Sequence, residues 1–314
     1  MLEAASLGED LDFSGFAKYG ELVIYGRTTR EQCPERIREA DVILANKLML
    51  DQGTLGQAEN LKLICVTATG VNNVDLDYAK SRGIGVANVA GYSTASVAQH
   101  TFALYFYVAE NLRYFDEYVK SGAYAASDTF SNLKEPFSQL EGKTWGIIGL
   151  GAIGTRVAAL AEAFGCRAGY YSSSGADRNP RYQRLELSEL LRDSDVVSVH
   201  APLTPATEKL FTYERFCRMK PSAVFINVGR GPIVDEPGLL RALEEKKIAA
   251  AALDVLEKEP MAADNPLLKF QDSRRLLITP HIAWASRESR QLLVRKLEEN
   301  LKSFAEGGRL NRIC

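Results

Sequence analysis

Thr144-Trp-Gly-Ile-Ile-Gly-Leu-Gly-Ala-Ile-Gly154 is the most informative segment of the chain. Its apolar run, residues 145–148, predicts a strand that is buried on both faces of a parallel sheet. A helical pattern follows over residues 155–164, and Gly165 lies where a helix of that length would end. The segment therefore predicts a strand, a glycine-rich turn and a helix in direct succession.

The glycines of this turn have the spacing Gly149-x-Gly151-x-x-Gly154. In a strand-turn-helix context, the first glycine permits a tight turn and the second lets a pyrophosphate approach the backbone. The third lets the helix pack close to the strand, with its first amides facing the anion. Glycines also recur at strand-to-helix turns that bind nothing, but the flanking pattern favours a dinucleotide site here.

Composition is that of an ordinary globular protein with room for two domains: 314 residues, 46% hydrophobic, 25% charged and a net charge of -2. The absence of a basic block gives no indication of a nucleic-acid surface. No apolar run approaches a membrane span, and the polar N-terminus does not resemble a signal peptide. Five scattered cysteines suit neither a metal site nor a disulfide framework, so we expect reduced thiols in the cytoplasm.

Before the glycine turn, residues 21–92 alternate short apolar runs with helical patterns. This alternation predicts a parallel sheet with helices on both faces, and hence a domain with its own core. The expected strands are residues 22–25, 42–45, 62–66 and 85–88, and the expected helices are residues 31–40 and 76–82.

Residues 93–118 contain neither proline nor glycine and predict one long helix, with Ser93 or Thr94 as its N-cap. The irregular segment 121–141 is interpreted as an arm that crosses to a partner subunit. A disordered loop is the alternative, which Phe130 and Phe137 make less favourable.

A second series of strands and helices follows the glycine turn. The expected strands are residues 169–171, 195–200, 223–227, 248–255 and 276–279. The expected helices are residues 188–192 with Ser188 as N-cap, 237–245 opened by Pro237, and an amphipathic helix at 286–305 that returns to the first domain.

Five motifs now stand in order along the chain. They are Gly149-Leu-Gly-Ala-Ile-Gly154, His200-Ala-Pro202, Asn227-Val-Gly-Arg-Gly231, Asp254-Val-Leu-Glu-Lys-Glu-Pro260 and Thr279-Pro-His-Ile282. The series resembles the D-2-hydroxyacid dehydrogenases. Residues 69–75, Thr-Gly-Val-Asn-Asn-Val-Asp, and 89–94, Val-Ala-Gly-Tyr-Ser-Thr, are similar to its glycerate dehydrogenase or hydroxypyruvate reductase branch.

The resemblance implies an α/β fold of two Rossmann-like, doubly wound domains with the active site in the cleft between them. Residues 1–93 and 286–314 would form a flavodoxin-like substrate domain, and residues 94–285 the NAD(P)-binding domain. It further implies a homodimer through residues 94–141, and domain closure with hinges near Ser93 and Ser286. Because Met1-Leu-Glu-Ala begins almost inside the first strand of the family pattern, we expect that strand to be short or frayed, with a misassigned start codon as the alternative.

Three residues are candidates for the chemistry of 2-keto acid reduction. His281 follows a predicted strand and Pro280, so it lies at a carboxyl end of the sheet and can act as the acid and base. By resemblance, Glu259 is its carboxylate partner, and Glu257 belongs to a solvated loop. Arg230, between two glycines, offers planar paired donors that can hold a carboxylate and polarise a keto oxygen.

The other two histidines receive different assignments. His100 lies in an apolar pattern and is expected to pack at the domain junction. By resemblance, His200 lines the cofactor loop and is not the acid.

Further contacts are implied by the resemblance. For the substrate they are Asn46, Thr69, Gly70 and Val71, together with Arg230 and His281; Trp284 is either pocket wall or core. For the cofactor they are Gly149, Gly151, Ala152, Ile153, Gly154, Ser172, Ser173, Ala201, Pro202, Val228, Gly229, Arg230, Asp254 and His281. For Asp254, a carboxylate bonded to the backbone at a strand end is a competing interpretation.

The residue at the expected ribose position is Ser172, in Ser172-Ser-Ser-Gly-Ala-Asp-Arg178, where an NAD enzyme would place an acid. A serine removes the charge that would repel a 2′-phosphate, and Ser173, Ser174 and Arg178 could bind one. We therefore favour NADP over NAD slightly, with Asp177 as the opposing feature.

The leading hypothesis is an oxidoreductase that transfers a hydride between NAD(P)H and a small 2-keto acid, hydroxypyruvate or glyoxylate, giving a D-2-hydroxy acid such as D-glycerate. Alternatives are a related dehydrogenase for lactate, phosphoglycerate or formate, and a dinucleotide-sensing binding protein. No metal, nucleic acid or membrane partner is expected.

Overall fold

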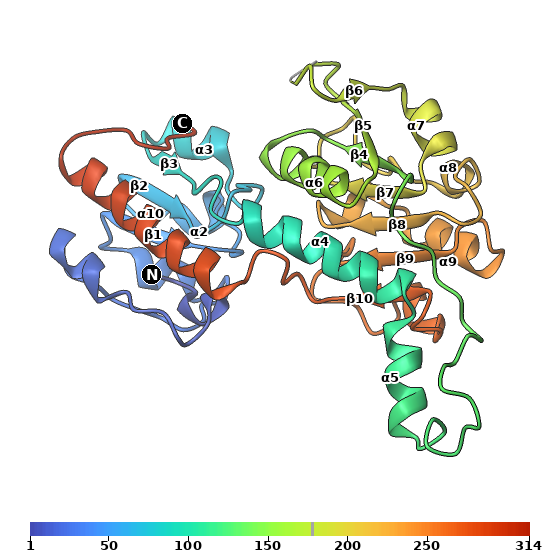
Figure 1. Ribbon diagram of the computed structural model, residues 1–314. Coiled ribbons are helices and arrows are strands. Elements are labelled where there is room, and N and C mark those ends of the chain that lie inside the picture. Colours follow the sequence, from blue (N-terminus) through green and yellow to red (C-terminus); the bar gives the residue numbers. More distant parts are fainter. Residues whose placement is uncertain (177–178) are drawn as a thin grey trace. The chain divides into compact units, whose positions relative to one another are not determined.

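The computed structural model describes residues 1–176 and 179–314. Asp177 and Arg178, which the sequence analysis weighed beside the ribose position, lie outside the described residues. The chain divides into two compact units (Figure 1). Unit 1 comprises Met1–Ser93 and Trp284–Cys314, and unit 2 comprises Thr94–Ala283, so the second boundary lies two residues before the predicted one.

Unit 1 is built on a parallel sheet of strand order β1-β2-β3. Its strands are β1 (Val42–Ala45), β2 (Leu63–Val66) and β3 (Gly85–Ala87). Successive residues of a strand point to opposite faces, so Ile43 and Ala45 enter one hydrophobic cluster while Leu44 enters the other. Both faces of the sheet are therefore buried.

Helices cover both faces of this sheet, as predicted. One cluster joins the strands to α1 (Cys33–Ile37), α2 (Gln52–Leu55) and α3 (Leu76–Ser81). The other joins them to the 3-10 helix η2 (Ser14–Tyr19) and to α10 (Arg287–Ala305), which Ser286 caps. Helix α10 is the predicted C-terminal helix, and its burial of Leu293 and Leu297 ties the end of the chain into unit 1.

The predicted strand at residues 22–25 is wrong. This segment has no regular secondary structure and makes only isolated backbone bonds, such as Tyr25 N to Met1 O at 2.9 Å. The N-terminal residues take the place beside β1 instead, since Leu2 N donates to Leu44 O at 2.9 Å. Val23 and Ile24 consequently remain 48% and 47% exposed, which the apolar run alone could not reveal.

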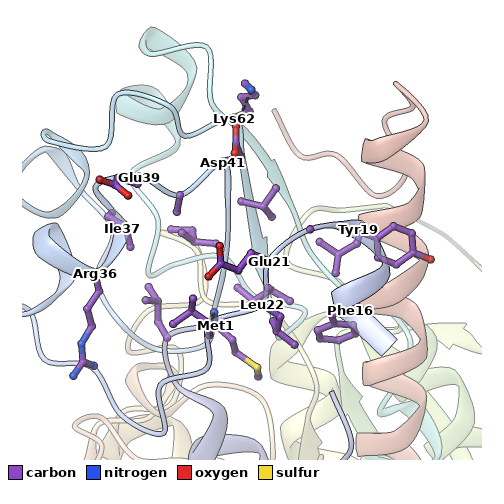
Figure 2. Close-up of a pocket in the computed structure, with 18 of the residues that line it drawn as sticks. Met1, Phe16, Tyr19, Glu21, Leu22, Arg36, Ile37, Glu39, Asp41 and Lys62 are labelled. Atoms are coloured by element: carbon purple, nitrogen blue, oxygen red, sulfur yellow. Dashed lines mark hydrogen bonds and ion pairs between the residues drawn. The ribbon is translucent and has the colours of Figure 1, made fainter. Parts of the chain in front are cut away.

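A groove of about 770 Å³ adjoins this edge of unit 1 (Figure 2). The Met1 ammonium donates to Val23 O at 2.7 Å, and burial lowers its pKa to about 6. Lys62 and Asp41 lie at one end of the groove and Phe16 at the other, in the view of Figure 2. None of the predicted site residues lines this groove.

Unit 2 is built on a parallel sheet of strand order β10-β9-β8-β7-β4-β5-β6. Its strands are β4 (Thr144–Ile148), β5 (Arg167–Tyr171), β6 (Gln183–Arg184), β7 (Val196–Val199), β8 (Val224–Asn227), β9 (Ala250–Leu253) and β10 (Leu276–Ile278). The order reverses between β4 and β7, and ligands of such sheets bind at that point, outside the carboxyl ends of the strands. All the predicted strands of this unit are present with shifted ends, while β6 was not predicted.

The helices of unit 2 are α4 (Thr94–Ala109), α5 (Leu112–Lys120), α6 (Ala152–Ala163), α7 (Leu187–Asp193), α8 (Tyr213–Phe216) and α9 (Glu236–Glu244). Residues 93–118 do not form one helix, because the chain turns at Asn111, whose φ of 53° is left-handed. Asparagine adopts this conformation more readily than most residues, which explains a break without proline or glycine. The N-cap of α7 is Glu186, so the prediction of Ser188 was also wrong.

Over residues 1–176 and 179–314, no helix combines the length and the apolar character that a membrane span requires. All five cysteines are free, and three of them are buried: Cys33, Cys65 and Cys166.

Candidate active site

The glycine turn follows β4 directly. Gly149 has a φ of +92°, and a Cβ on Gly154 would lie 2.2 Å from Gly149 O, so neither position accommodates a side chain. Gly151 is different, because a Cβ there would meet no heavy atom within 4 Å. Gly151 is the N-cap of α6 and provides no side-chain cap, so the first amides of the helix face open space above it.

His200 lies beside this turn, at the end of β7. Trp145 Nε1 donates to Ser198 Oγ at 2.8 Å, and Ser198 Oγ lies 2.9 Å from His200 Nε2. Burial lowers the pKa of His200 to about 3, so this ring is neutral at physiological pH. Its Nδ1 is buried and has no hydrogen-bond partner among the described residues.

His281 and Glu259 form a pair at the ends of β10 and β9. His281 Nδ1 lies 2.7 Å from Glu259 Oε2. The other carboxylate oxygen of Glu259 accepts Leu256 N at 2.9 Å, so the carboxylate is held by its own loop. Both side chains are partly exposed, which leaves the imidazole accessible and oriented.

Glu257, the alternative partner, is engaged elsewhere. Its carboxylate pairs with Lys209 Nζ at 2.7 Å, and its backbone amide donates to Glu236 Oε1 at 2.7 Å. Glu236 is buried and also accepts Asn265 Nδ2 at 2.7 Å. Glu236 therefore braces the loop that carries Glu259.

Arg230 follows β8 on a loop that Asn227 shapes. Asn227 is buried, its Nδ2 donates to Arg230 O at 3.1 Å, and its Oδ1 accepts Gly229 N at 3.0 Å. A Cβ on Gly231 would lie 1.8 Å from the carbonyl carbon of Leu256. The loops of Arg230 and Glu259 therefore touch backbone to backbone, and only glycine permits this approach.

Asp254, at the end of β9, organises the loop that carries His281. Its side chain is 1% exposed; Oδ1 accepts Thr279 Oγ1 at 2.6 Å and Ile282 N at 2.9 Å, and Oδ2 accepts Ala283 N at 2.8 Å. His100 Nε2 lies 3.1 Å from Thr279 Oγ1. Burial lowers the pKa of His100, and the nearby Asp254 charge opposes that shift.

Ser172 follows β5, where the acid of an NAD enzyme was expected. Its Oγ lies 3.2 Å from Ser174 Oγ. Ser172 and Ser173 are partly exposed.

The predicted substrate residues of unit 1 lie after β1 and β2. Asn46 is buried, and its Nδ2 donates to Ser6 Oγ at 2.9 Å. Thr69 Oγ1 donates to Val89 O at 2.9 Å, at the end of the bend that directly precedes Gly70 and Val71. The Trp284 ring contacts Tyr92 edge to face and packs partly against the core of unit 1.

Comparison with known proteins decides the family. The model for the NAD-binding domain of D-isomer specific 2-hydroxyacid dehydrogenases matches residues 102–283. A hydroxypyruvate reductase of Blautia hydrogenotrophica is 37% identical over 96% of this chain and 94% of its own. A glycerate dehydrogenase of Methylorubrum extorquens is 37% identical over 89% of this chain and 87% of its own.

The chain belongs to the D-isomer specific 2-hydroxyacid dehydrogenase family.

Solved structures with a similar fold include enzymes of the same kind. The crystal structure of an NADPH-dependent glyoxylate/hydroxypyruvate reductase from Sinorhizobium meliloti, in complex with NADP and malonate, matches with a TM-score of 0.82 at 28% identity, covering 94% of this chain and 90% of that one. The predicted α/β class with two Rossmann-like domains is thus confirmed, as are the predicted family and a nicotinamide dinucleotide as the class of cofactor. In this dehydrogenase, the open space above Gly151 and the uncapped start of α6 fit the pyrophosphate of that group.

Sequence reasoning missed the residues that support the site: Asn227, Glu236, Thr279 and the Gly231–Leu256 contact. Glu236 and Thr279 act through partners that are distant in sequence, and Asn227 and Gly231 act through backbone contacts that residue type does not predict. Among the described residues, no group of His, Cys, Asp or Glu side chains is arranged to hold a metal ion.

Proposed function

We propose that this dehydrogenase reduces a small 2-keto acid of the hydroxypyruvate or glyoxylate class with NAD(P)H, giving a D-2-hydroxy acid such as D-glycerate. The observation that carries the proposal is the His281–Glu259 pair at 2.7 Å, on strand ends of the same sheet edge as Arg230 and the glycine turn. The hydroxypyruvate reductase and glycerate dehydrogenase relatives support the substrate class.

The three side chains divide the work of carbonyl reduction. The bound nicotinamide supplies or accepts the hydride at the substrate carbon. Arg230 binds the carboxylate and polarises the keto oxygen with paired donors. His281 gives a proton to that oxygen as the hydride arrives, and takes it back in the reverse direction.

Glu259 acts on His281 in this scheme. Because its carboxylate contacts Nδ1, it stabilises the imidazolium before proton transfer and fixes the ring so that Nε2 is the nitrogen directed to substrate. It is the counter-charge of the acid, and Glu257 has no part in the reaction.

We further propose that the cofactor is preferentially NADPH. The supporting feature is Ser172, which follows β5 where an acid would otherwise bind the ribose and repel a 2′-phosphate. Ser173 belongs to the same segment and offers a second hydroxyl. Ala152, Ile153, Ala201, Pro202, Val228 and Gly229 are the remaining proposed cofactor contacts.

The loop at residues 68–71 is a proposed contributor to carboxylate binding, through the backbone of Thr69, Gly70 and Val71. Asn46 is a further proposed substrate contact, and its amide group donates to Ser6 Oγ. We place the reaction in the cytoplasm, where the free thiols of this chain stay reduced.

A matrix of kcat/KM tests substrate and cofactor together: hydroxypyruvate, glyoxylate, pyruvate and phosphohydroxypyruvate, each with NADPH and NADH. We expect the highest values for hydroxypyruvate or glyoxylate with NADPH. A maximum at pyruvate or phosphohydroxypyruvate would move the enzyme to another branch of its family. No turnover with any of them, together with nucleotide-dependent binding of another protein, would favour the sensing alternative.

A further inference from the structure

Two side chains of helix α4 form hydrogen bonds with the loop that carries His281. Ser96 Oγ donates to Ala283 O at 2.6 Å, and His100 Nε2 lies 3.1 Å from Thr279 Oγ1. Ser96 and His100 are four residues apart, so they lie on the same face of the helix, one turn from each other. The two contacts fall on either side of His281.

His281 needs such support because its backbone is strained. Its φ of 55° lies in the left-handed region, which costs a residue with a Cβ free energy and persists only where the surroundings impose it. Its amide donates to Asp254 O at 2.8 Å, while the Asp254 carboxylate accepts the amides of the next two residues. The loop is therefore fixed around a single buried carboxylate.

Thr279 connects the helix to that carboxylate. Its hydroxyl donates to Asp254 Oδ1 at 2.6 Å, so its oxygen is left to accept from His100 Nε2. This order of donors assigns the proton of a neutral His100 to Nε2. Each hydrogen-bond donor thus has an acceptor. The series of bonds leads from His100 on α4, through Thr279 just after β10, to Asp254 just after β9.

We propose that His100, Thr279 and Asp254 form a positioning relay that holds His281 in its left-handed conformation against Glu259, with Ser96 as the second anchor on α4. The proposal rests on the proposed function for its kinetic consequence, but its structural consequence stands alone. None of the three relay residues gives or takes the substrate proton.

Thr279→Val and Thr279→Ser are the matched pair that tests the relay. Valine keeps the shape and removes the hydroxyl, whereas serine keeps the hydroxyl. Loss of the bond should let His281 leave Glu259, so we expect Thr279→Val to lower kcat at least tenfold and to leave the Kd for NADPH within about twofold, which is the precision of such a titration. Proton transfer should then limit turnover, so the solvent deuterium isotope effect on kcat should rise in Thr279→Val and return to the wild-type value in Thr279→Ser.

A readout independent of activity is the imidazole NMR spectrum. With only three histidines, the Nδ1 proton of His281 can be assigned by single substitutions. We expect its hydrogen-bonded signal to persist in Thr279→Ser and to broaden or shift in Thr279→Val, with His100→Gln as a second variant should Thr279→Val not fold.

The outcomes separate the two proposals. Wild-type kcat, isotope effect and His281 signal in both Thr279→Val and His100→Gln would overturn the relay. A wild type that reduces no keto acid, but whose His281 signal responds to these substitutions, would overturn the proposed function and support the relay.

Discussion

Glu259 and Glu257 are chemically identical and two positions apart, yet they have different surroundings. Glu259 contacts the imidazole of His281, whereas Glu257 forms an exposed ion pair with Lys209. An exposed pair contributes little to stability. The two glutamates therefore give a direct test of which carboxylate serves the reaction.

Glu259→Gln removes the charge and keeps the size of the side chain. We expect kcat to fall about 10²-fold, in the range by which an acid–base residue contributes, because the imidazolium loses its counter-charge. KM for the keto acid should change much less, since Arg230 still binds the carboxylate. Steady-state kinetics measure both values.

Glu257→Gln is the control for that prediction and should retain wild-type kcat. Equal losses of kcat in the two variants would contradict the assignment of Glu259 as the partner of His281.

His200 predicts a dependence of stability on pH. Burial lowers its pKa from 6.5 to about 3 in the folded state, so the unfolded state takes up this proton first as the pH falls. The stabilisation is fully present above pH 6.5 and is lost toward pH 3, by up to about 1.4 kcal/mol per pH unit. Urea unfolding of the wild type and of His200→Gln at several pH values measures the difference in slope.

Above pH 7, the free energies of unfolding of the wild type and of His200→Gln should change with pH in the same way, because His200 is then neutral in both the folded and the unfolded state. If the two free energies of unfolding also change in the same way between pH 6 and pH 4, the neutral, buried state of His200 is refuted.

At the level of residues, the sequence was most informative where a motif carries its own chemistry. Residue type and position at predicted strand ends made Arg230 and His281 candidates, and the family resemblance selected them and preferred Glu259 to Glu257. The relay partner Thr279 could not be selected in this way, because its hydroxyl bonds Asp254 and His100, which lie 25 and 179 residues away in the chain. Tertiary partners of this kind leave no local pattern.

The sequence analysis did not predict the break between α4 and α5, and the conformation of one residue explains that break. Asn111 has a φ of 53°, whereas the prediction treated residues 93–118 as continuous helix. Because alanine tolerates left-handed backbone less well than asparagine or glycine, Asn111→Ala should destabilise the protein by about 1 kcal/mol. Asn111→Gly should be neutral or stabilising, and urea unfolding compares the two.

If Asn111→Ala is as stable as the wild type, the turn does not depend on the conformation of this residue.

The strands of unit 2 were predictable because a whole run of residues, and no single residue, carries their signal. β4, β7, β8 and β9 lie inside a parallel sheet covered on both faces, so they are nearly continuous apolar runs. The run at residues 22–25 has similar composition but finds no continuous partner strand. Composition therefore identified buried strands and could not identify which run lacks a neighbour.

Unit 2 presents an exposed apolar surface on α5 and the segment that follows it. None of the residues of α5 is buried, and Figure 1 shows α5 and the following segment projecting from the sheet of unit 2. Phe130 is 92% exposed and Leu133 is 82% exposed. A concentration of this kind is typical of an interaction surface, and we propose that a second copy of the chain covers it.

The predicted state is a dimer of the 34.6 kDa chain, measured by light scattering after size exclusion. The double variant Phe130→Asp, Leu133→Asp should elute as a monomer, because two charges would be buried without partners. Leu310→Asp, at an apolar position of unit 1 that is 45% exposed, is the control and should stay dimeric. A monomeric wild type, or a dimeric double variant, would contradict the proposed interface.

The central claim is keto acid reduction through His281, and one comparison tests it most directly. Wild type and His281→Gln are mixed with NADPH and hydroxypyruvate, nicotinamide absorbance is followed, and NADPH binding is titrated separately. The account predicts rapid loss of absorbance and a D-glycerate product for the wild type, and a loss of about 10²- to 10⁴-fold in kcat for His281→Gln with NADPH still bound. A wild type that leaves the absorbance unchanged, or a His281→Gln variant that turns over like the wild type, would contradict it.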